Sequence, residues 1–397
     1  MRVTHVITRL IIGGAQENTI ASVLGLGSLP GLEVDLLAGP TSGPEGSLEA
    51  ELRAAGPARS SVAPLLTIIP ELVRPVHPWK DLLALRRLTK IFRARRPDLV
   101  HTHSGKAGVL GRLAASRAGV PIIVHTVHGP SFGTFQGRWA NALFRGAEQR
   151  AARVTTHFVS VADAMTQQYL AAGIGRPEQF TRIFSGFPLA PYFAAQNDLA
   201  LRARFGLSSD DLVVGKIARL VPLKGHDTLF AIAPSLLAAC PQLKFLFVGD
   251  GVWRGRFEQM ARASGLQNHF RFAGLMPPKD IPSLLGIMDI LVHLSEREGL
   301  PRALPQALAA GRPVVAFDCD GAREVCRDGE TGFLVRPGHG HALSERLLLL
   351  ARDARLRAEL AARGREFVRA NFAVELMIAN LHRLYVNLAA DRGLAAT

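Results

Sequence analysis

Cysteine, long apolar runs and export signals are scarce in this chain. An odd, low number of cysteines excludes a disulfide framework and fits a reducing compartment. No stretch approaches the roughly 18 apolar residues of a membrane-spanning helix, and the nearest, residues 281–294, contains an aspartate. Residues 1–14 lack the long apolar core and cleavage site of a signal peptide. We therefore expect a cytoplasmic protein. Its three cysteines are Cys240, Cys319 and Cys326.

Acidic residues are also relatively few. Against 33 acidic residues stand 47 basic ones, which gives a formal charge of +14. This excess favours either a solvated basic surface or attraction to an anionic partner, which could be a membrane surface, a substrate or a nucleic acid. The chain lacks zinc-finger spacing, an aromatic-rich RNA-binding signature and a basic low-complexity tail. We therefore expect no nucleic-acid partner.

Strand and helix patterns alternate in both halves of the 397 residues. Strands separated by helices of ten or more residues predict parallel sheets with helices on both faces. The first half has expected strands over 3–8, 33–38, 98–102 and 122–127, with helices over 16–26, 78–95 and 106–118. The second half has expected strands over 212–218, 243–248, 270–273, 290–294, 313–317 and 333–335, a mainly helical segment over 341–371 and a last helix over 374–391.

The join between the halves lies near residues 186–207, which hold glycine, proline and asparagine and little strand pattern. We predict an α/β protein with two facing Rossmann-like, doubly wound domains over 1–190 and 191–375. A C-terminal helix within 376–397 is expected to pack back on the first domain. Ligands of such sheets bind at the carboxyl ends of the strands, so we expect an active site in a cleft between the domains.

Glycines stand at two of these strand ends. The strand over 3–8 leads through Gly13 and Gly14 into a helix, where backbone N–H groups and the helix N-terminus suit a phosphate. Tight-turn geometry explains the same pair equally well. Gly249 and Gly251 end the strand over 243–248, where they either admit a nucleotide or form a turn.

Two cations follow the strand over 212–218. Arg219 and Lys224 lie in one loop at the carboxyl end of that strand, and such a pair suits a diphosphate. A diphosphate that leaves a sugar gains charge in the transition state, so fixed cations aimed at it lower the barrier.

The segment over 295–311 is the densest in candidate site residues. Glu298 precedes a turn that contains Gly299 and Leu300 and leads into a helix. Backbone N–H groups at this turn can face an anion, while Glu298 can accept hydrogen bonds from sugar hydroxyls. Gln306 lies one to two turns into the helix. The alternative is a glutamate that caps the helix and a surface glutamine.

Two patterns could indicate a metal, and we expect none. His101 and His103 stand two residues apart, with no third ligand evident from the spacing. The segment 318–320 reads Asp-Cys-Asp, which we interpret as a polar turn after a strand. We predict no metal and no other cofactor.

Taken in order, these motifs resemble those of family-4 glycosyltransferases, which are retaining enzymes of the GT-B fold. The resemblance covers nearly the whole chain, and seven motifs in family order are specific although each alone is weak. The motifs are Gly13-Gly14-Ala15, His101-Thr102-His103-Ser104, His125-Thr126-Val127-His128-Gly129, Arg219 to Gly225, Gly249-Asp250-Gly251, Glu298 to Gly311, and Gly321-Ala322-Arg323-Glu324-Val325.

The resemblance implies a nucleotide-diphosphate sugar as donor. Arg219 and Lys224 would bind its diphosphate, and Glu298 would contact the transferred sugar. Gly299, Leu300, Gly249 and Gly251 would complete the donor site, and Gly13 and Gly14 would let the first domain approach the phosphates or the sugar.

The resemblance also implies front-face transfer with retention, in which the leaving phosphate helps to take the proton. His128 would lie beside the reacting centre, where it orients the sugar. The family typically has a glutamate at the position of Gln306, where it holds the ribose. A neutral acceptor is weaker by roughly 1 kcal/mol, so donor affinity is expected to be lower.

The expected helix over 79–95 is strongly basic. From Arg74 to Arg96 there are eight basic residues and one acidic residue, Asp81. Such a helix could lie on anionic lipid at the inner face of the membrane, or it could pack on the sheet with a basic outer face. In the first case the acceptor would be a glycan or lipid-linked glycan used for a surface polysaccharide or glycolipid.

Two other functions remain open at this stage. One is a GT-B-fold enzyme that isomerises or hydrolyses nucleotide sugars without an acceptor. The other is a catalytically weak sugar-nucleotide-binding partner of a larger assembly. Gln306 is the main support for the latter, and the presence of Glu298, Arg219, Lys224 and His128 counts against it.

Overall fold

The computed structural model describes residues 1–43, 45–54, 65–133 and 135–394. The chain forms two compact units. The first consists of Met1–Phe187 together with Val374–Thr397, and the second of Pro188–Ala373. The C-terminal segment therefore belongs to the first unit, although it follows the second in sequence.

The first unit is built on a seven-stranded sheet with the order β3-β2-β1-β4-β5-β6-β7, in which every pairing is parallel. Its central strands are buried along almost their whole length, as expected of a parallel sheet covered on both faces. The strands are β1 (Arg2–Ile7), β2 (Glu33–Ala38), β3 (Leu66–Ile68), β4 (Leu99–His103), β5 (Ile122–Val127), β6 (His157–Ser160) and β7 (Phe180–Arg182).

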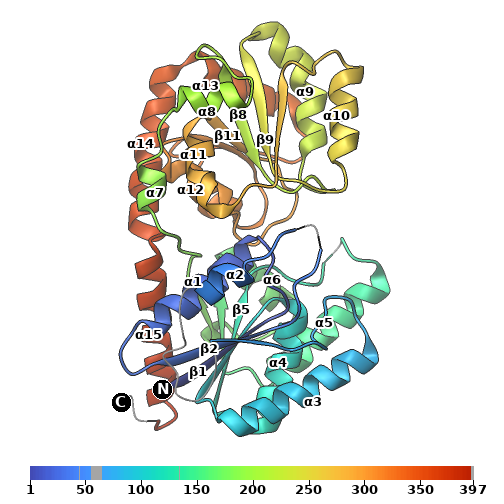
Figure 1. The fold of residues 1–397 in the computed structure, drawn as a ribbon, viewed down its shortest axis with the longest axis vertical. Helices are drawn as coiled ribbons and strands as arrows, with labels where there is room; N and C mark the ends of the chain where they lie inside the picture. The colour runs from blue at the N-terminus through green and yellow to red at the C-terminus, as the bar shows by residue number, and fades with distance from the viewer. Residues whose placement is uncertain (44, 55–64, 134, 395–397) are drawn as a thin grey trace. The chain divides into compact units, whose positions relative to one another are not determined.

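Helices cover both faces of this sheet and create two separate cores (Figure 1). Because side chains alternate along a strand, Val3 and Ile7 enter one core and Val6 enters the other. The first core includes α1 and α15, and the second includes α3 and α4. The helices are α1 (Gly14–Gly27), α2 (Glu49–Ala54), α3 (Pro78–Arg95), α4 (Gly105–Ala118), α5 (Arg138–Ala152), α6 (Asp163–Ala171) and α15 (Val374–Ala390).

The second unit repeats this architecture with a six-stranded parallel sheet of order β10-β9-β8-β11-β12-β13. The strands are β8 (Leu212–Ile217), β9 (Leu243–Val248), β10 (Phe270–Gly274), β11 (Ile290–His293), β12 (Val314–Phe317) and β13 (Gly332–Val335). The helices are α7 (Ala190–Phe193), α8 (Leu199–Arg204), α9 (His226–Ala239), α10 (Arg254–Ala263), α11 (Ile281–Gly286), α12 (Ala303–Ala309), α13 (Gly340–Arg352) and α14 (Ala354–Asn371).

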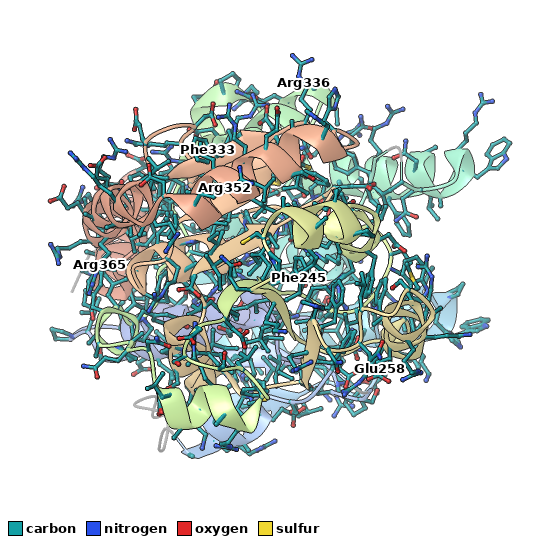
Figure 2. All side chains as sticks on the ribbon, turned by 90° about the horizontal axis from the view of Figure 1, so that it is seen from above. Phe245, Glu258, Phe333, Arg336, Arg352 and Arg365 are labelled. Atoms are coloured by element: carbon teal, nitrogen blue, oxygen red, sulfur yellow. The ribbon has the colours of Figure 1, made fainter. Side chains whose placement is uncertain are left out.

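Aromatic side chains fill the core of the second unit. Phe245 is fully buried and stacks on Phe270 with ring centroids 4.7 Å apart. In contrast, the basic residues Arg336 and Arg352 lie at the surface of the same unit (Figure 2). Apolar burial of this kind is the main favourable term in the folding of each unit.

The predicted pair of doubly wound parallel-sheet domains is confirmed. The mainly helical segment predicted over 341–371 is two helices, α13 and α14, that meet at Asp353. The Asp353 carboxylate accepts a hydrogen bond of 2.8 Å from the Leu356 N–H, which caps the start of α14. None of the helices in the described ranges combines the length and apolar character needed to cross a membrane.

Candidate active site

The loop between β8 and α9 carries Lys224 at the carboxyl end of the second sheet. Its path is constrained at Gly225, which has φ 69° and caps α9. A Cβ atom at this position would lie 2.1 Å from the Leu294 carbonyl oxygen, so only glycine fits. The turn directs the Lys224 ammonium to the carboxylate of Glu298, to which it donates a hydrogen bond.

Glu298 is held from three sides. Its backbone N–H donates to Oδ2 of Asp320 at 2.8 Å, its Oε1 lies 3.6 Å from Nε2 of His293, and Lys224 approaches the same oxygen. Burial alone would raise the pKa of Glu298, but contact with His293 and the charge of Lys224 outweigh burial and lower it well below its usual value. Glu298 is therefore an ionised carboxylate in a fixed position, which can accept hydrogen bonds from hydroxyl groups.

Asp320 is a site residue that the sequence interpretation missed, since the segment 318–320 was expected to be only a polar turn. It follows β12 and adopts a left-handed conformation with φ 48°, which aspartate tolerates better than most residues. The Gly321 N–H also donates to the Gly299 carbonyl at 3.1 Å. The turn after β12 therefore supports the turn at Glu298 and Gly299, a relation that depends on β11 and β12 being neighbours.

Gly249 and Gly251 let the loop after β9 pack against the loop that carries Arg219. At Gly249, with φ 138°, a Cβ atom would lie 2.2 Å from the Ala218 carbonyl oxygen, and at Gly251 it would lie 2.4 Å from that of Leu220. Close backbone approach explains both glycines. It also holds in place the segment that presents Arg219.

Two of the predicted site residues are at α12: Leu300 precedes the helix and Gln306 is part of it. Leu300 is buried just before the helix, and Gln306 lies within it with 7% of its surface exposed. The alternative interpretation of Gln306 as a surface glutamine is therefore wrong, because α12 is buried along its whole length. In the second unit the structure brings Lys224 and Glu298 into direct contact and places Arg219 in the same loop as Lys224.

In the first unit, Gly13, Gly14 and His128 follow strands that flank β4 on either side. Gly13 is extended, with φ 173°, so its conformation does not require glycine. An added Cβ would meet only the flexible end of Gln16, at 2.9 Å. Neither a tight turn nor close packing therefore requires glycine at this position.

His128 lies at the end of a line of imidazole rings. Nδ1 of His103 is 3.1 Å from Nε2 of His128, and Nε2 of His103 is 2.9 Å from Nδ1 of His5. Burial lowers the pKa of His5 to about 3 and that of His103 well below its usual value. Both rings are therefore neutral at physiological pH.

Spacing alone offered no third metal ligand beside His101 and His103, but the fold places His5 there. Their nearest ligand atoms all lie within 4.8 Å of one another. However, the ring nitrogens of His101 contact Tyr385 and Thr126, and those of His103 contact His5 and His128. A metal would have to break these hydrogen bonds, so the cluster fits a hydrogen-bonded network better than a metal centre.

Comparison with known proteins places the chain in a family. Residues 16–183 match the glycosyl transferase 4-like domain and residues 198–367 match glycosyl transferases group 1. The chain is 32% identical over 285 residues to a GDP-mannose-dependent alpha-mannosyltransferase of Mycobacterium tuberculosis, with 70% of each protein covered. It is 29% identical over 272 residues to the UDP-Gal:alpha-D-GlcNAc-diphosphoundecaprenol alpha-1,3-galactosyltransferase of Escherichia coli, which covers 67% of this chain and 70% of that protein.

A solved structure shares this fold. The crystal structure of Anabaena HepE in complex with UDP-glucose matches 98% of this chain and 100% of that one, with a TM-score of 0.80 and 23% identity. The two doubly wound domains and this likeness show that the chain has the GT-B fold. The chain belongs to glycosyltransferase family 4, and it is an enzyme that transfers glycosyl groups.

Proposed function

We propose that this glycosyltransferase moves a sugar from a nucleotide-diphosphate donor with retention and without a metal ion. Arg219 and Lys224 bind the donor diphosphate, Glu298 accepts hydrogen bonds from the transferred sugar, and His128 orients that sugar. The contact of Lys224 with Glu298 carries the proposal, because it places a fixed cation beside a fixed hydroxyl acceptor. The Lys224 side of this contact suits a phosphate, and the Glu298 side suits a sugar.

The chemistry follows from the charges at this site. The acceptor oxygen forms a bond to the anomeric carbon, the bond from that carbon to the diphosphate breaks, and the acceptor proton passes to a leaving phosphate oxygen. Negative charge grows on the diphosphate during this step. Preorganised cations stabilise that charge more in the transition state than in the ground state, so Arg219 and Lys224 can replace a metal ion.

Replacing Lys224 by alanine tests the diphosphate assignment. Turnover should fall by roughly 100-fold or more, as is typical when a preorganised charge contact is lost. Lys279→Ala is the matched control, because Lys279 is an exposed lysine of the same unit. Equal turnover in the two variants would reject the assignment. Full activity in excess EDTA is expected, and loss of activity that Mg²⁺ restores would reject metal independence.

The acceptor we propose is a glycan or lipid-linked glycan in polysaccharide or glycolipid synthesis. The Escherichia coli relative acts on a sugar joined to diphosphoundecaprenol, which supports an acceptor of this kind. An isomerase, a hydrolase or a catalytically weak binding partner is not favoured, since the relatives described above are transferases. Donor turnover at an unchanged rate without any acceptor would favour hydrolysis instead.

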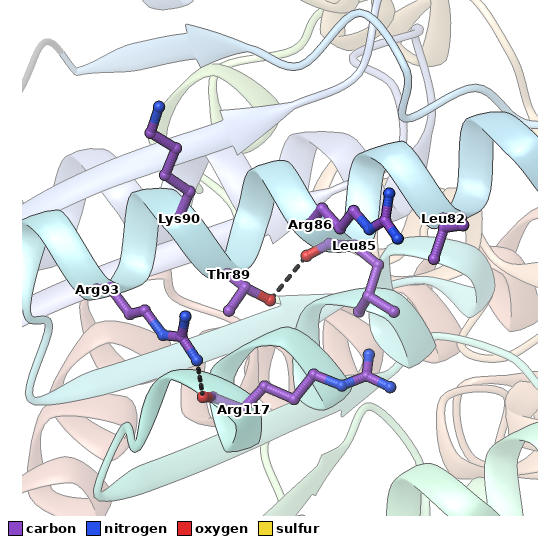
Figure 3. A pocket seen from close by; sticks show the side chains of 7 residues that line it. All are labelled: Leu82, Leu85, Arg86, Thr89, Lys90, Arg93 and Arg117. Carbon is purple, nitrogen blue, oxygen red and sulfur yellow. Dashed lines mark hydrogen bonds between the residues drawn. The ribbon is translucent and has the colours of Figure 1, made fainter.

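A basic groove supports docking of the first unit on the cytoplasmic face of an anionic membrane. The groove lies on α3 and the end of α4, has a volume of about 420 Å³, and is lined by four basic and no acidic residues (Figure 3). Close by, Trp79 and Leu83 on α3 are 73% and 50% exposed. Cations beside exposed apolar side chains suit an anionic lipid surface. The lining residues are Leu82, Leu85, Arg86, Thr89, Lys90, Arg93 and Arg117.

Vesicle co-sedimentation tests this docking. The unaltered protein should pellet with phosphatidylglycerol vesicles and not with phosphatidylcholine vesicles. The double variant Arg86→Glu/Lys90→Glu should stay in the supernatant. Arg262→Glu/Lys279→Glu, which changes net charge equally at exposed positions of the second unit, should still pellet. Equal loss in both variants would show that net charge, and not this groove, drives binding.

A further inference from the structure

A lysine is completely buried in the sheet of the second unit. Lys216 lies on β8 with 0% of its surface exposed, and its strand neighbour on β9 is the fully buried Phe247. Its Nζ is buried and has no hydrogen-bond partner among the described residues. Burial of an unpaired ammonium is costly, and such a group loses its proton when it has no compensating partner.

Four ionisable groups interact with Lys216. Lys224 comes from the loop after β8 and Glu298 from the loop after β11, while His226 begins α9 and His293 ends β11. Burial lowers the pKa of both histidines, so neither carries charge at neutral pH. Glu298 is therefore the charged acid of the cluster, and its carboxylate accepts a hydrogen bond from Lys224 and not from Lys216.

If both lysines are protonated, the cluster has two positive charges and only one negative charge. Burial, together with the positive charge of Lys224, lowers the pKa of Lys216 to about 7. A diphosphate beside Lys224 would supply the missing negative charge and favour the protonated form of Lys216. Because linkage is reciprocal, protonation of Lys216 must in turn strengthen binding of the anion.

We propose that Lys216 takes up a proton when the donor diphosphate binds beside Lys224, so that a buried lysine couples donor affinity to pH. This inference rests on the proposed function. It deepens that function by adding a residue outside the motifs that carry the family resemblance. Lys216 acts through the charge of the cluster and need not touch the donor. Donor affinity should fall by up to about tenfold per pH unit above neutrality, the limit for the uptake of one proton.

Isothermal titration calorimetry measures this uptake directly. UDP-galactose and GDP-mannose are titrated at pH 8 in phosphate and in Tris buffers, and whichever binds is used further. The difference in enthalpy between the buffers gives the number of protons bound. For the unaltered protein we expect about half a proton or more per donor.

Lys216→Met is the decisive variant, because it keeps the volume and removes the ionisable group. It should fold with an unchanged or higher melting temperature, since replacing an unpaired buried charge by an apolar side chain is neutral or stabilising. Proton uptake should vanish, and donor affinity should become independent of pH between 7 and 9. Lys244→Met, the same change on β9 at a lysine whose Nζ donates to the Asn268 carbonyl, should keep the uptake of the unaltered protein.

The outcomes separate the two proposals. Donor binding without proton uptake, or uptake that persists in Lys216→Met, overturns the role of Lys216 and leaves the glycosyltransferase site intact. A melting temperature several degrees lower in Lys216→Met would show that the lysine is a paired structural group, which also overturns the inference. If neither donor nor UDP nor GDP binds, the proposed donor site fails and this inference fails with it.

Discussion

Nδ1 of His103 lies 3.1 Å from Nε2 of His128, so a fully buried ring contacts the histidine that we place beside the transferred sugar. A neutral imidazole has one donor and one acceptor nitrogen, so proton positions along His5, His103 and His128 are linked. Nε2 of His5 has no partner among the described residues. Since an orphaned buried N–H is rare, this nitrogen is the bare acceptor, and each ring donates toward His128.

Replacing His103 by leucine should therefore impair His128 without direct contact with substrate. We expect kcat to fall about tenfold, the equivalent of losing one hydrogen bond of about 1.4 kcal/mol, with little change in KM. Steady-state kinetics measures the effect, and ¹⁵N chemical shifts of the imidazoles should show His128 losing its single tautomer. His157→Leu, at a half-buried histidine of the same sheet, is the control. Equal kcat in the two variants would exclude a positioning role.

Gln306→Glu should strengthen donor binding. A carboxylate accepts hydrogen bonds from ribose hydroxyls more strongly than an amide carbonyl, by about 1 kcal/mol, which corresponds to roughly fivefold in Kd. Because Gln306 is almost fully buried, the same change should lower the melting temperature of the ligand-free protein. Calorimetric titration with the donor measures Kd, and Gln267→Glu at an exposed position of the same unit controls for added charge. Weaker donor binding in Gln306→Glu would contradict a ribose contact.

The contribution of Glu298 to stability should depend on pH in one direction. Its folded-state pKa is lowered, so its stabilising effect is fully present above the unfolded pKa of about 4.3 and is lost as the pH falls toward the folded pKa. Glu298→Gln should thus lower the melting temperature at pH 7, and the deficit should shrink below pH 4. Glu345→Gln, at an exposed glutamate, should show no such trend. A deficit that stays constant down to pH 3 would argue against an ionised, charge-paired Glu298.

Local pattern was sufficient to predict two parallel sheets and most of the long helices, although α5 was not predicted. The helix predicted over 78–95 is confirmed, because Pro78 fits the first turn of a helix and apolar residues recur with helical spacing. The strands β3, β6 and β7 were not predicted. They have three or four residues each, too few for alternation to stand out.

Local sequence pattern could not predict contacts that depend on the order of strands in a sheet. His5 and His103 are 98 positions apart in sequence and meet only because β1 pairs with β4. Tyr385 reaches His101 from the C-terminal helix across 284 positions. The residue type of Lys216 gave no sign of its burial, because lysines are almost never fully buried; its burial follows from the position of β8 between β9 and β11 inside the sheet.

A buried ion pair gives the last prediction, which concerns stability rather than catalysis. Arg112 on α4 contacts Glu148 on α5, and the two side chains are 0% and 1% exposed. The same guanidinium donates to the Gly108 carbonyl at 2.8 Å and to Thr155 at 3.3 Å. Removal of one partner leaves the other charge buried and unpaired, which typically costs about 3–5 kcal/mol.

Glu148→Ala should therefore lower the melting temperature of the first unit by roughly 6–20 °C, at about 2–4 °C per kcal/mol for a unit of this size. The double variant Arg112→Met/Glu148→Leu should recover most of that loss, because an apolar pair of similar volume has no charge to desolvate. Glu178→Ala removes an ion pair whose side chains are 72% and 65% exposed, and it should leave the melting temperature almost unchanged, because water screens exposed charges. Scanning calorimetry distinguishes these outcomes. If Glu148→Ala and Glu178→Ala have the same melting temperature, the Arg112 guanidinium has found another partner or water. The contact between α4 and α5 then does not depend on charge pairing.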